Sequence, residues 1–155
     1  MPLPQDRLTK LIHESELDEQ LNYEMERARR YEWDLGLILV VPRLPENNAD
    51  MMYPALKRLA LACSSIMRVV DRGIRWGNGI FFILPETPAE GVDVAARKIQ
   101  EEFERTEIAH PTTGETFLCG MGKSIRVYNG KHAKANPGEA MDFKQMKQAI
   151  KEGLE

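Results

Sequence analysis

A two-strand hairpin is the most constraining feature of this 155-residue sequence. Its tip is Gly77-Asn78-Gly79, and the flanking segments Arg72 to Trp76 and Ile80 to Leu84 have the composition of strands. Asn-Gly is the strongest short signal for a type I′ turn, because both central residues of that turn need a positive φ. The sequence therefore predicts an antiparallel pair of strands joined at Asn78-Gly79.

Apolar spacing predicts the other elements. The run from Leu35 to Val41 is too short for a buried helix and rich in branched residues, so it is predicted to be a central strand, and a further strand is expected from Phe117 to Val127. A polar loop is expected from Asn129 to Gly138. Apolar residues at steps of three and four indicate helices over Ser15 to Tyr31 with Ser15 as N-cap, Asp50 to Met67, Thr87 to Arg105 with Thr87 as N-cap, and Met141 to Gly153.

From Leu35 onward the order is β-α-β-β-α-β, with an extra helix before it and another after it. This order is typical of the α+β class, in the split βαβ arrangement, with a central antiparallel sheet flanked by helices that lie on one face. A chain of 155 residues with 43% apolar residues is the right size for one compact domain, so residues 1–155 are predicted to form a single domain.

Net charge, the length of the apolar runs and the cysteine spacing indicate which partners and sites are not expected. A formal net charge of −3 gives no reason to expect nucleic acid or a membrane surface as partner. The longest apolar run, Leu35 to Val41, is far shorter than the ~20 residues that cross a bilayer. Cys63 and Cys119 lack metal-ligand spacing, so both are predicted to be buried thiols in a reducing compartment. A cytoplasmic protein without a metal or cofactor is expected.

Several motifs stand in register along the chain. Arg68 and Asp71 form an Arg-x-x-Asp motif five residues before Gly77-Asn78-Gly79-Ile80-Phe81. Asp6 to Leu11, Glu26 to Arg30 and Leu84 to Thr87 read DRLTKL, ERARR and LPET. Together they resemble the GGDEF family, the diguanylate cyclases, whose motifs are Asp-x-Leu-Thr-Gly-Leu, Arg-Ala-Arg, Arg-x-x-Asp, Gly-Gly-Asp/Glu-Glu-Phe and Leu-Pro-x-Thr. The resemblance implies the nucleotidyl-cyclase-like fold.

This sequence departs from the GGDEF motifs at the positions that serve catalysis in the family. In the family, an Asp-x-Asp segment and the hairpin acids hold Mg²⁺, which requires hard oxygen ligands. Here Val41-Pro42-Arg43 stands in place of Asp-x-Asp, and Asn78 and Gly79 stand in place of the hairpin acids. The resemblance therefore implies a degenerate GGDEF domain that is not an enzyme.

The retained Arg-x-x-Asp motif is the inhibitory site of the family, which binds cyclic di-GMP. An arginine guanidinium can donate two hydrogen bonds at once, to phosphate oxygens or to the O6 and N7 edge of guanine. A carboxylate can accept hydrogen bonds from the N–H groups of guanine. The resemblance places Arg68 and Asp71 as the primary contacts and implies a supporting cation, which falls at Lys98, while Arg72 is a second candidate. The hypothesis is a cyclic di-GMP receptor that signals through a protein partner or through self-association, as in a homodimer.

Other interpretations stay open at this point. Arg68 and Asp71 could form only a local ion pair at a helix end. The chain could then be a protein–protein interaction module that uses the GGDEF fold and binds no nucleotide. Binding of GTP without turnover is disfavoured, because the metal ligand and the hairpin acids are absent.

Overall fold

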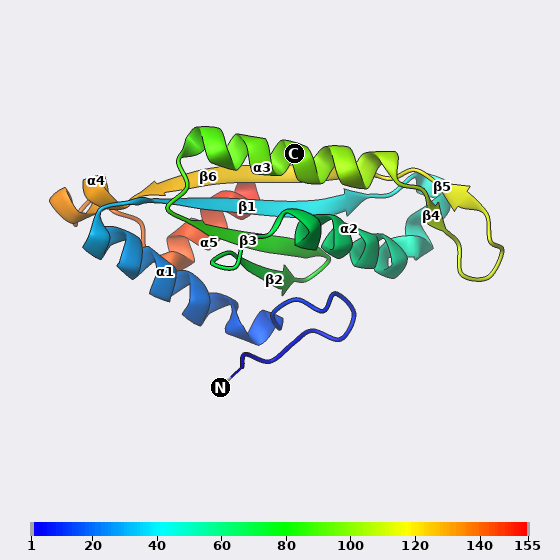
Figure 1. Ribbon diagram of the computed structural model, residues 1–155, viewed down its shortest axis with the longest axis horizontal. Helices are drawn as coiled ribbons and strands as arrows, with labels where there is room; N and C mark the ends of the chain where they lie inside the picture. The colour runs from blue at the N-terminus through cyan, green and yellow to red at the C-terminus, as the bar shows by residue number, and fades with distance from the viewer. Residues whose placement is uncertain (1, 155) are drawn as a thin grey trace.

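A four-stranded antiparallel sheet forms the centre of the computed structural model, which describes residues 2–154 (Figure 1). Its strands are β1 (Asp34–Arg43), β2 (Arg72–Trp76), β3 (Gly79–Pro85) and β6 (Gly120–Asn129), in the spatial order β2-β3-β1-β6. Ile38 of β1 pairs with Phe82 on one side and with Ile125 on the other. The prediction of a central strand at Leu35 to Val41 is confirmed.

Helices cover both faces of this sheet. The core helices α2 (Met52–Ile66) and α3 (Ala89–Arg105) pack on one face, as predicted. The outer helices α1 (Leu17–Tyr31) and α5 (Phe143–Glu152) pack on the other, and in Figure 1 α5 passes behind the sheet while α2 lies in front of it. The expectation of helices on one face alone is therefore wrong. Successive strand side chains point to opposite faces, so burial of both faces accounts for the unbroken apolar run of β1.

The hairpin turn lies one residue earlier than predicted. Trp76 pairs with Gly79, so the two central residues are Gly77 and Asn78. Gly77 has φ of 59° and Asn78 has no positive φ, which is the φ pattern of a type II′ turn. Gly79 belongs to β3, where a Cβ would lie 2.8 Å from Val41 Cγ1. The glycine at position 79 thus allows close packing against β1 and is not a turn residue.

Other boundaries differ from the predictions. The predicted strand from Phe117 is divided, because β5 (Thr116–Phe117) pairs with β4 (Ile108–Ala109) in a separate two-stranded sheet. The predicted polar loop contains α4 (Gly130–Ala135), whose N-cap Asn129 accepts a hydrogen bond from the His132 backbone. Short 3₁₀ helices, η1 (Glu14–Glu16) and η2 (Glu46–Met51), precede α1 and α2. Ser15 is therefore not the N-cap of α1.

Both cysteines are buried free thiols, as predicted. Burial raises the pKa of the Cys63 and Cys119 thiols, so both are held in the neutral form. Between residues 2 and 154, no helix combines the length and the apolar composition that a membrane crossing needs.

Candidate functional site

Arg68 and Asp71 are brought together by the tight turn between α2 and β2. The Asp71 backbone N–H donates to the Arg68 carbonyl oxygen at 3.1 Å, and the Arg68 N–H donates to Asp71 Oδ2 at 2.8 Å. Val69 and Val70 occupy the tip of this turn, and Val69 is 98% exposed. The turn therefore places a cation and an acid face to face, with two valines projecting into solvent.

The Arg68 side chain is anchored on one side by three groups. Nη2 donates to Asp71 Oδ1 at 2.8 Å, to the Pro85 carbonyl oxygen at 3.0 Å and to Thr87 Oγ1 at 2.8 Å, while Nε donates to both Asp71 oxygens. The Asp71 side chain is 3% exposed and that of Arg68 is 50% exposed. The hydrogen bond to Asp71 raises the pKa of Arg68. The local ion pair that the sequence left open is thus formed, and Arg68 Nη1 makes no hydrogen bond within residues 2–154.

A concave pocket of about 220 Å³, called here the Arg68 pocket, surrounds this cation. Lys98, on α3, lines the same pocket, so the structure brings together three of the four residues predicted for the site. Arg72 does not line it; this first residue of β2 lines a neighbouring cavity together with Lys10 and Val69. The residues that line the Arg68 pocket are Ile66, Arg68, Asp71, Leu84, Thr87, Gly91, Val94, Ala95 and Lys98.

Thr87 is the member of this pocket that the sequence analysis assigned wrongly. It was predicted to cap α3, but Pro88 occupies the N-cap position, and no side chain caps this helix. The Thr87 hydroxyl instead donates to the Pro85 carbonyl at 2.9 Å and accepts from Arg68. Between them, Glu86 has φ of 53°, so a left-handed residue folds the chain back toward Arg68. The Leu-Pro-x-Thr motif was the available signal for this role.

A second cavity lies at the opposite end of the β2–β3 hairpin, and its volume is about 380 Å³. It is called here the tip pocket. Its lining residues are Leu39, Val41, Pro42, Met52, Trp76, Gly77, Asn78, Gly79, Lys151 and Leu154. Between residues 2 and 154, no aspartate or glutamate lines it, and no group of three or more His, Cys, Asp or Glu could bind a metal. The residues at this position therefore do not fit Mg²⁺, which takes oxygen ligands.

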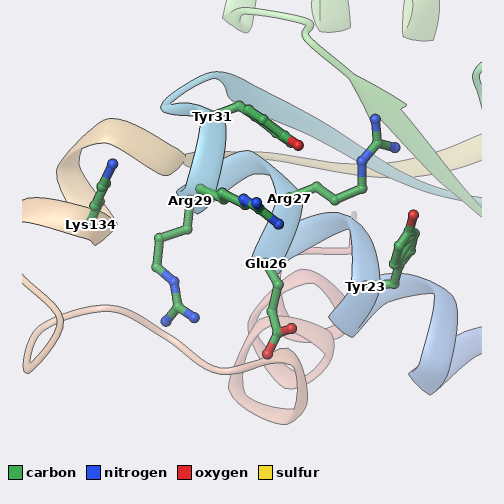
Figure 2. Close-up of a pocket in the computed structure, with 7 residues that line it drawn as sticks. Tyr23, Glu26, Arg27, Arg29, Tyr31 and Lys134 are labelled. Carbon is green, nitrogen blue, oxygen red and sulfur yellow. The ribbon is translucent and has the colours of Figure 1, made fainter.

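A third cavity, of about 450 Å³, lies on the outer side of α1 and is called here the basic pocket (Figure 2). In that view Tyr23 and Arg27 lie on one side of the helix, while Arg29 and Lys134 lie on the other. Arg27 pairs with the buried Glu24 at 2.9 Å, and its guanidinium lies over the Tyr23 ring. Lining residues are Tyr23, Glu26, Arg27, Arg29, Arg30, Tyr31 and Lys134. Glu26 to Arg30 was recognised from the sequence only as a family motif, and the local cluster of positive charge that it forms with Lys134 was not predicted.

The fold is shared with solved GGDEF structures. The GGDEF domain of DgcB from Caulobacter crescentus, solved in complex with c-di-GMP, superposes with a TM-score of 0.80 at 15% identity, over 96% of this chain and 83% of that one. For the FimX GGDEF domain from Pseudomonas aeruginosa, the TM-score is 0.73 at 16% identity, over 97% and 95%. The chain has the fold of a GGDEF domain.

A further GGDEF-containing structure is similar over part of its length. Diguanylate cyclase SiaD from Pseudomonas aeruginosa, solved in complex with its activator SiaC, gives a TM-score of 0.70 at 20% identity, over 97% of this chain and 59% of that one. No protein-family model matches the sequence, and no curated protein matches it. At these identities the similarity establishes the GGDEF fold, while the function has to be argued from the residues of the sites.

Proposed function

We propose that this GGDEF-fold chain is a catalytically inactive receptor for cyclic di-GMP, and that the Arg68 pocket is its binding site. The observation that carries the proposal is the asymmetric anchoring of Arg68. Asp71, Pro85 and Thr87 hold the guanidinium from one side, while Nη1 and half of the side-chain surface stay free. A cation fixed in this way is preorganised for an anionic ligand, because little side-chain freedom is lost on binding.

The pocket supplies complementary groups for a phosphate and a base. Arg68 Nη1 can donate to a phosphate oxygen or to the guanine edge, and the exposed Lys98 ammonium adds a second positive charge. Ile66, Val94 and Ala95 give the pocket apolar walls. Asp71 serves here mainly as the positioning residue for Arg68, because both its oxygens already accept from that side chain. A direct bond from Asp71 to guanine would require one of these hydrogen bonds to be exchanged.

The size of the Arg68 pocket limits how much of a bound ligand it can enclose, and the part that stays exposed could contact a partner. A volume of about 220 Å³ is below the range of about 300–1,000 Å³ typical of small-molecule sites, so the pocket would hold only part of a cyclic dinucleotide. The remainder would lie near the exposed valines of the Arg68–Asp71 turn. A ligand half outside the pocket presents a surface to a protein partner or to a second copy of this chain. The proposed response is therefore that bound cyclic di-GMP bridges this chain to a protein partner or to a second copy of itself.

The proposal of inactivity depends on the tip pocket. Val41, which stands where the family motif has its first aspartate, lines it together with Pro42, and Asn78 stands at the hairpin tip in place of an acid. An apolar wall gives Mg²⁺ no ligand, and a triphosphate requires such a counter-charge during transfer. Support for the ligand comes from DgcB, which was solved with c-di-GMP, and support for a partner comes from SiaD, which was solved with its activator SiaC.

Calorimetric titration with cyclic di-GMP and with GTP tests the proposal. Cyclic di-GMP is expected to bind the wild-type chain, and GTP is expected neither to bind nor to be converted with Mg²⁺ present. Arg68→Ala should weaken binding at least about a hundredfold, consistent with the loss of charge-assisted hydrogen bonds. Asp71→Ala should also weaken it, because Arg68 loses its anchor. Absence of heat with cyclic di-GMP, or formation of cyclic dinucleotide from GTP, would overturn the proposal.

Two neighbouring cations on α3 provide the matched control. Lys98 lines the Arg68 pocket, whereas the adjacent exposed Arg97 does not. Lys98→Ala is expected to weaken cyclic di-GMP binding about three- to tenfold, and Arg97→Ala to leave it unchanged. Arg72→Ala, at the edge of the neighbouring cavity, should have a smaller effect than Lys98→Ala. Equal effects of Lys98→Ala and Arg97→Ala would indicate general charge attraction in place of a defined site.

The basic pocket favours a second candidate function, a protein interaction module that binds no nucleotide. Four cationic side chains and one acidic side chain line it, on a chain whose formal net charge is −3. Exposed tyrosines beside arginines are typical of protein interfaces. Pull-down by an acidic partner that is abolished by Arg29→Glu, together with no response to cyclic di-GMP, would favour this function over the first.

A further inference from the structure

The tip pocket has the composition of a small-molecule site. Its volume of about 380 Å³ falls within the range of about 300–1,000 Å³ typical of such sites. Side chains from three separate elements and from the segment after α5 form its walls: Leu39 and Val41 from β1, Met52 from α2, Trp76 from β2, and Leu154. A concave wall of aliphatic, thioether and indole groups favours an apolar ring or chain.

One cation stands at this apolar wall. Among the residues from 2 to 154 that line the pocket, Lys151, in the last turn of α5, has the only charged side chain. It is exposed and makes no ion pair or hydrogen bond through its side chain with any residue from 2 to 154. Its neighbour Lys147, by contrast, pairs with Asp18. The Lys151 ammonium is therefore available to a negative group brought in by a ligand.

We propose that the tip pocket binds a small amphiphilic anion, an apolar ring or short chain that carries a single carboxylate. The apolar part would lie against Val41, Met52 and Trp76, and the carboxylate would face Lys151. The Asn78 side chain, also at this pocket, adds an amide N–H₂ that can donate to the same carboxylate. One free cation balances one negative charge, which makes a monocarboxylate a better match than a nucleoside triphosphate.

This site is independent of the Arg68 pocket. The two cavities share no lining residue, and they lie at opposite ends of the β2–β3 hairpin. A ligand in the tip pocket therefore need not compete with cyclic di-GMP. The inference does not rest on the proposed receptor function, and either one can fail alone.

Nuclear magnetic resonance titration of the ¹⁵N-labelled chain tests the site with octanoate, 1-naphthoate and the uncharged 1-naphthalenemethanol. Both acids, or the one whose shape fits, should shift the backbone amides of Gly77, Asn78 and Gly79 with a dissociation constant in the micromolar to low millimolar range. The amides of Arg68 and Asp71 should not move. The neutral alcohol should bind more weakly than 1-naphthoate.

Surface variants separate the charge from the apolar wall. Lys151→Gln should weaken binding of the acids about three- to fivefold, as expected for an exposed charge contact, and should not change binding of the alcohol. Lys144→Gln, on the same helix but outside the pocket, is the matched control and should change neither. Leu154→Ala should weaken all three ligands about five- to tenfold through lost apolar contact. Unmoved tip amides at millimolar acid, or equal binding of alcohol and acid, would overturn the proposal.

Discussion

The two ends of the β2–β3 hairpin differ in what holds them. At one end Arg68 is bound by Asp71, Pro85 and Thr87, and the acid is buried. At the other end the tip pocket has an apolar wall and one lysine, Lys151, whose side chain pairs with no residue from 2 to 154. The strand segments between them are filled with buried side chains such as Phe81 and Phe82. The comparison teaches that the two ends of one hairpin can carry different functional groups while the buried strands between them keep the same packing. Loops carry function on a rigid scaffold.

The same contrast predicts where substitutions will be costly. At the Arg68 end, removal of one partner leaves a buried polar group unsatisfied, which costs more than the bond itself contributes. At the tip, the exposed side chain of the turn residue Asn78 lines the tip pocket and makes no hydrogen bond within residues 2–154. Stability should therefore depend strongly on the Arg68 anchor at the first end and weakly on the Asn78 side chain at the second.

Arg68→Ala should give the largest effect. It leaves the buried Asp71 carboxylate with only a backbone donor, and we expect it to lower the free energy of unfolding by about 2–4 kcal/mol. Urea unfolding measures this loss. The double variant Arg68→Ala with Asp71→Ala should be less destabilised than the single Arg68→Ala variant, because the uncompensated charge is gone. A double variant with additive losses would mean that the pair is not coupled.

Asp6→Asn should give the next largest effect, at the tip end. Burial by itself would raise the pKa of Asp6, but hydrogen bonds from the Thr9 N–H and hydroxyl and from Arg75 outweigh it, so this pKa is lowered from 3.8. The stabilisation is therefore present above the unfolded-state pKa and is lost as the pH falls through the folded-state value. At neutral pH we expect a loss of about 1–3 kcal/mol.

Unfolding at a series of pH values checks the sign of this effect. The stability difference between wild type and Asp6→Asn should be constant near neutral pH and should shrink below the ordinary pKa of 3.8. A difference that grows on acidification would contradict the assignment.

Thr87→Val should give a smaller effect at the Arg68 end. The substitution keeps the shape of the side chain and removes the hydroxyl that accepts from Arg68 and donates to Pro85. A loss of about 0.5–1.5 kcal/mol in unfolding free energy is expected, together with weaker binding of cyclic di-GMP. Thr113→Val, in an exposed loop, is the control. If Thr87→Val were neutral in both measurements, the hydroxyl would have no part in anchoring Arg68.

Asn78→Ser should give the smallest effect. Asn78 is exposed, and serine is compatible with the second position of this turn, so the unfolding free energy should change by no more than about 0.5 kcal/mol. Binding of cyclic di-GMP should be unchanged within error. A large loss of stability or of cyclic di-GMP affinity would show that the two ends are coupled, and the contrast between them would no longer hold.

Much of the fold could be predicted from local patterns. The strand at Leu35 to Val41 and the hairpin were recognisable because strand and turn preferences act between residues near in sequence. Boundaries were less accurate where distant residues decide them. Gly79, in β3, pairs with Trp76, and its lack of a Cβ leaves room for Val41 of β1, a close approach that the Asn-Gly pattern does not contain.

The candidate site was predictable in part for the same reason. Arg68 and Asp71 are three positions apart, so one tight turn brings them together. Lys98 joined them through the family resemblance, and the structure places it at the same pocket. Thr87 was missed as an anchor although the Leu-Pro-x-Thr motif contains it, because its contact with Arg68 depends on the left-handed Glu86 that returns the chain toward Arg68. The Lys134 contribution to the basic pocket depends on α4, which the sequence analysis did not predict.

The sequence by itself determined the order of the main strands and helices, the absence of acidic residues at Val41, Asn78 and Gly79, and the separation of Arg68 and Asp71 by three positions. All three follow from residue type and short spacing. Only the tertiary structure decided that α1 and α5 cover the second face, that Thr87 holds Arg68, and that Val41, Trp76 and Lys151 line one cavity. These outcomes depend on contacts between segments far apart in the chain, whose geometry is set by packing of the whole core.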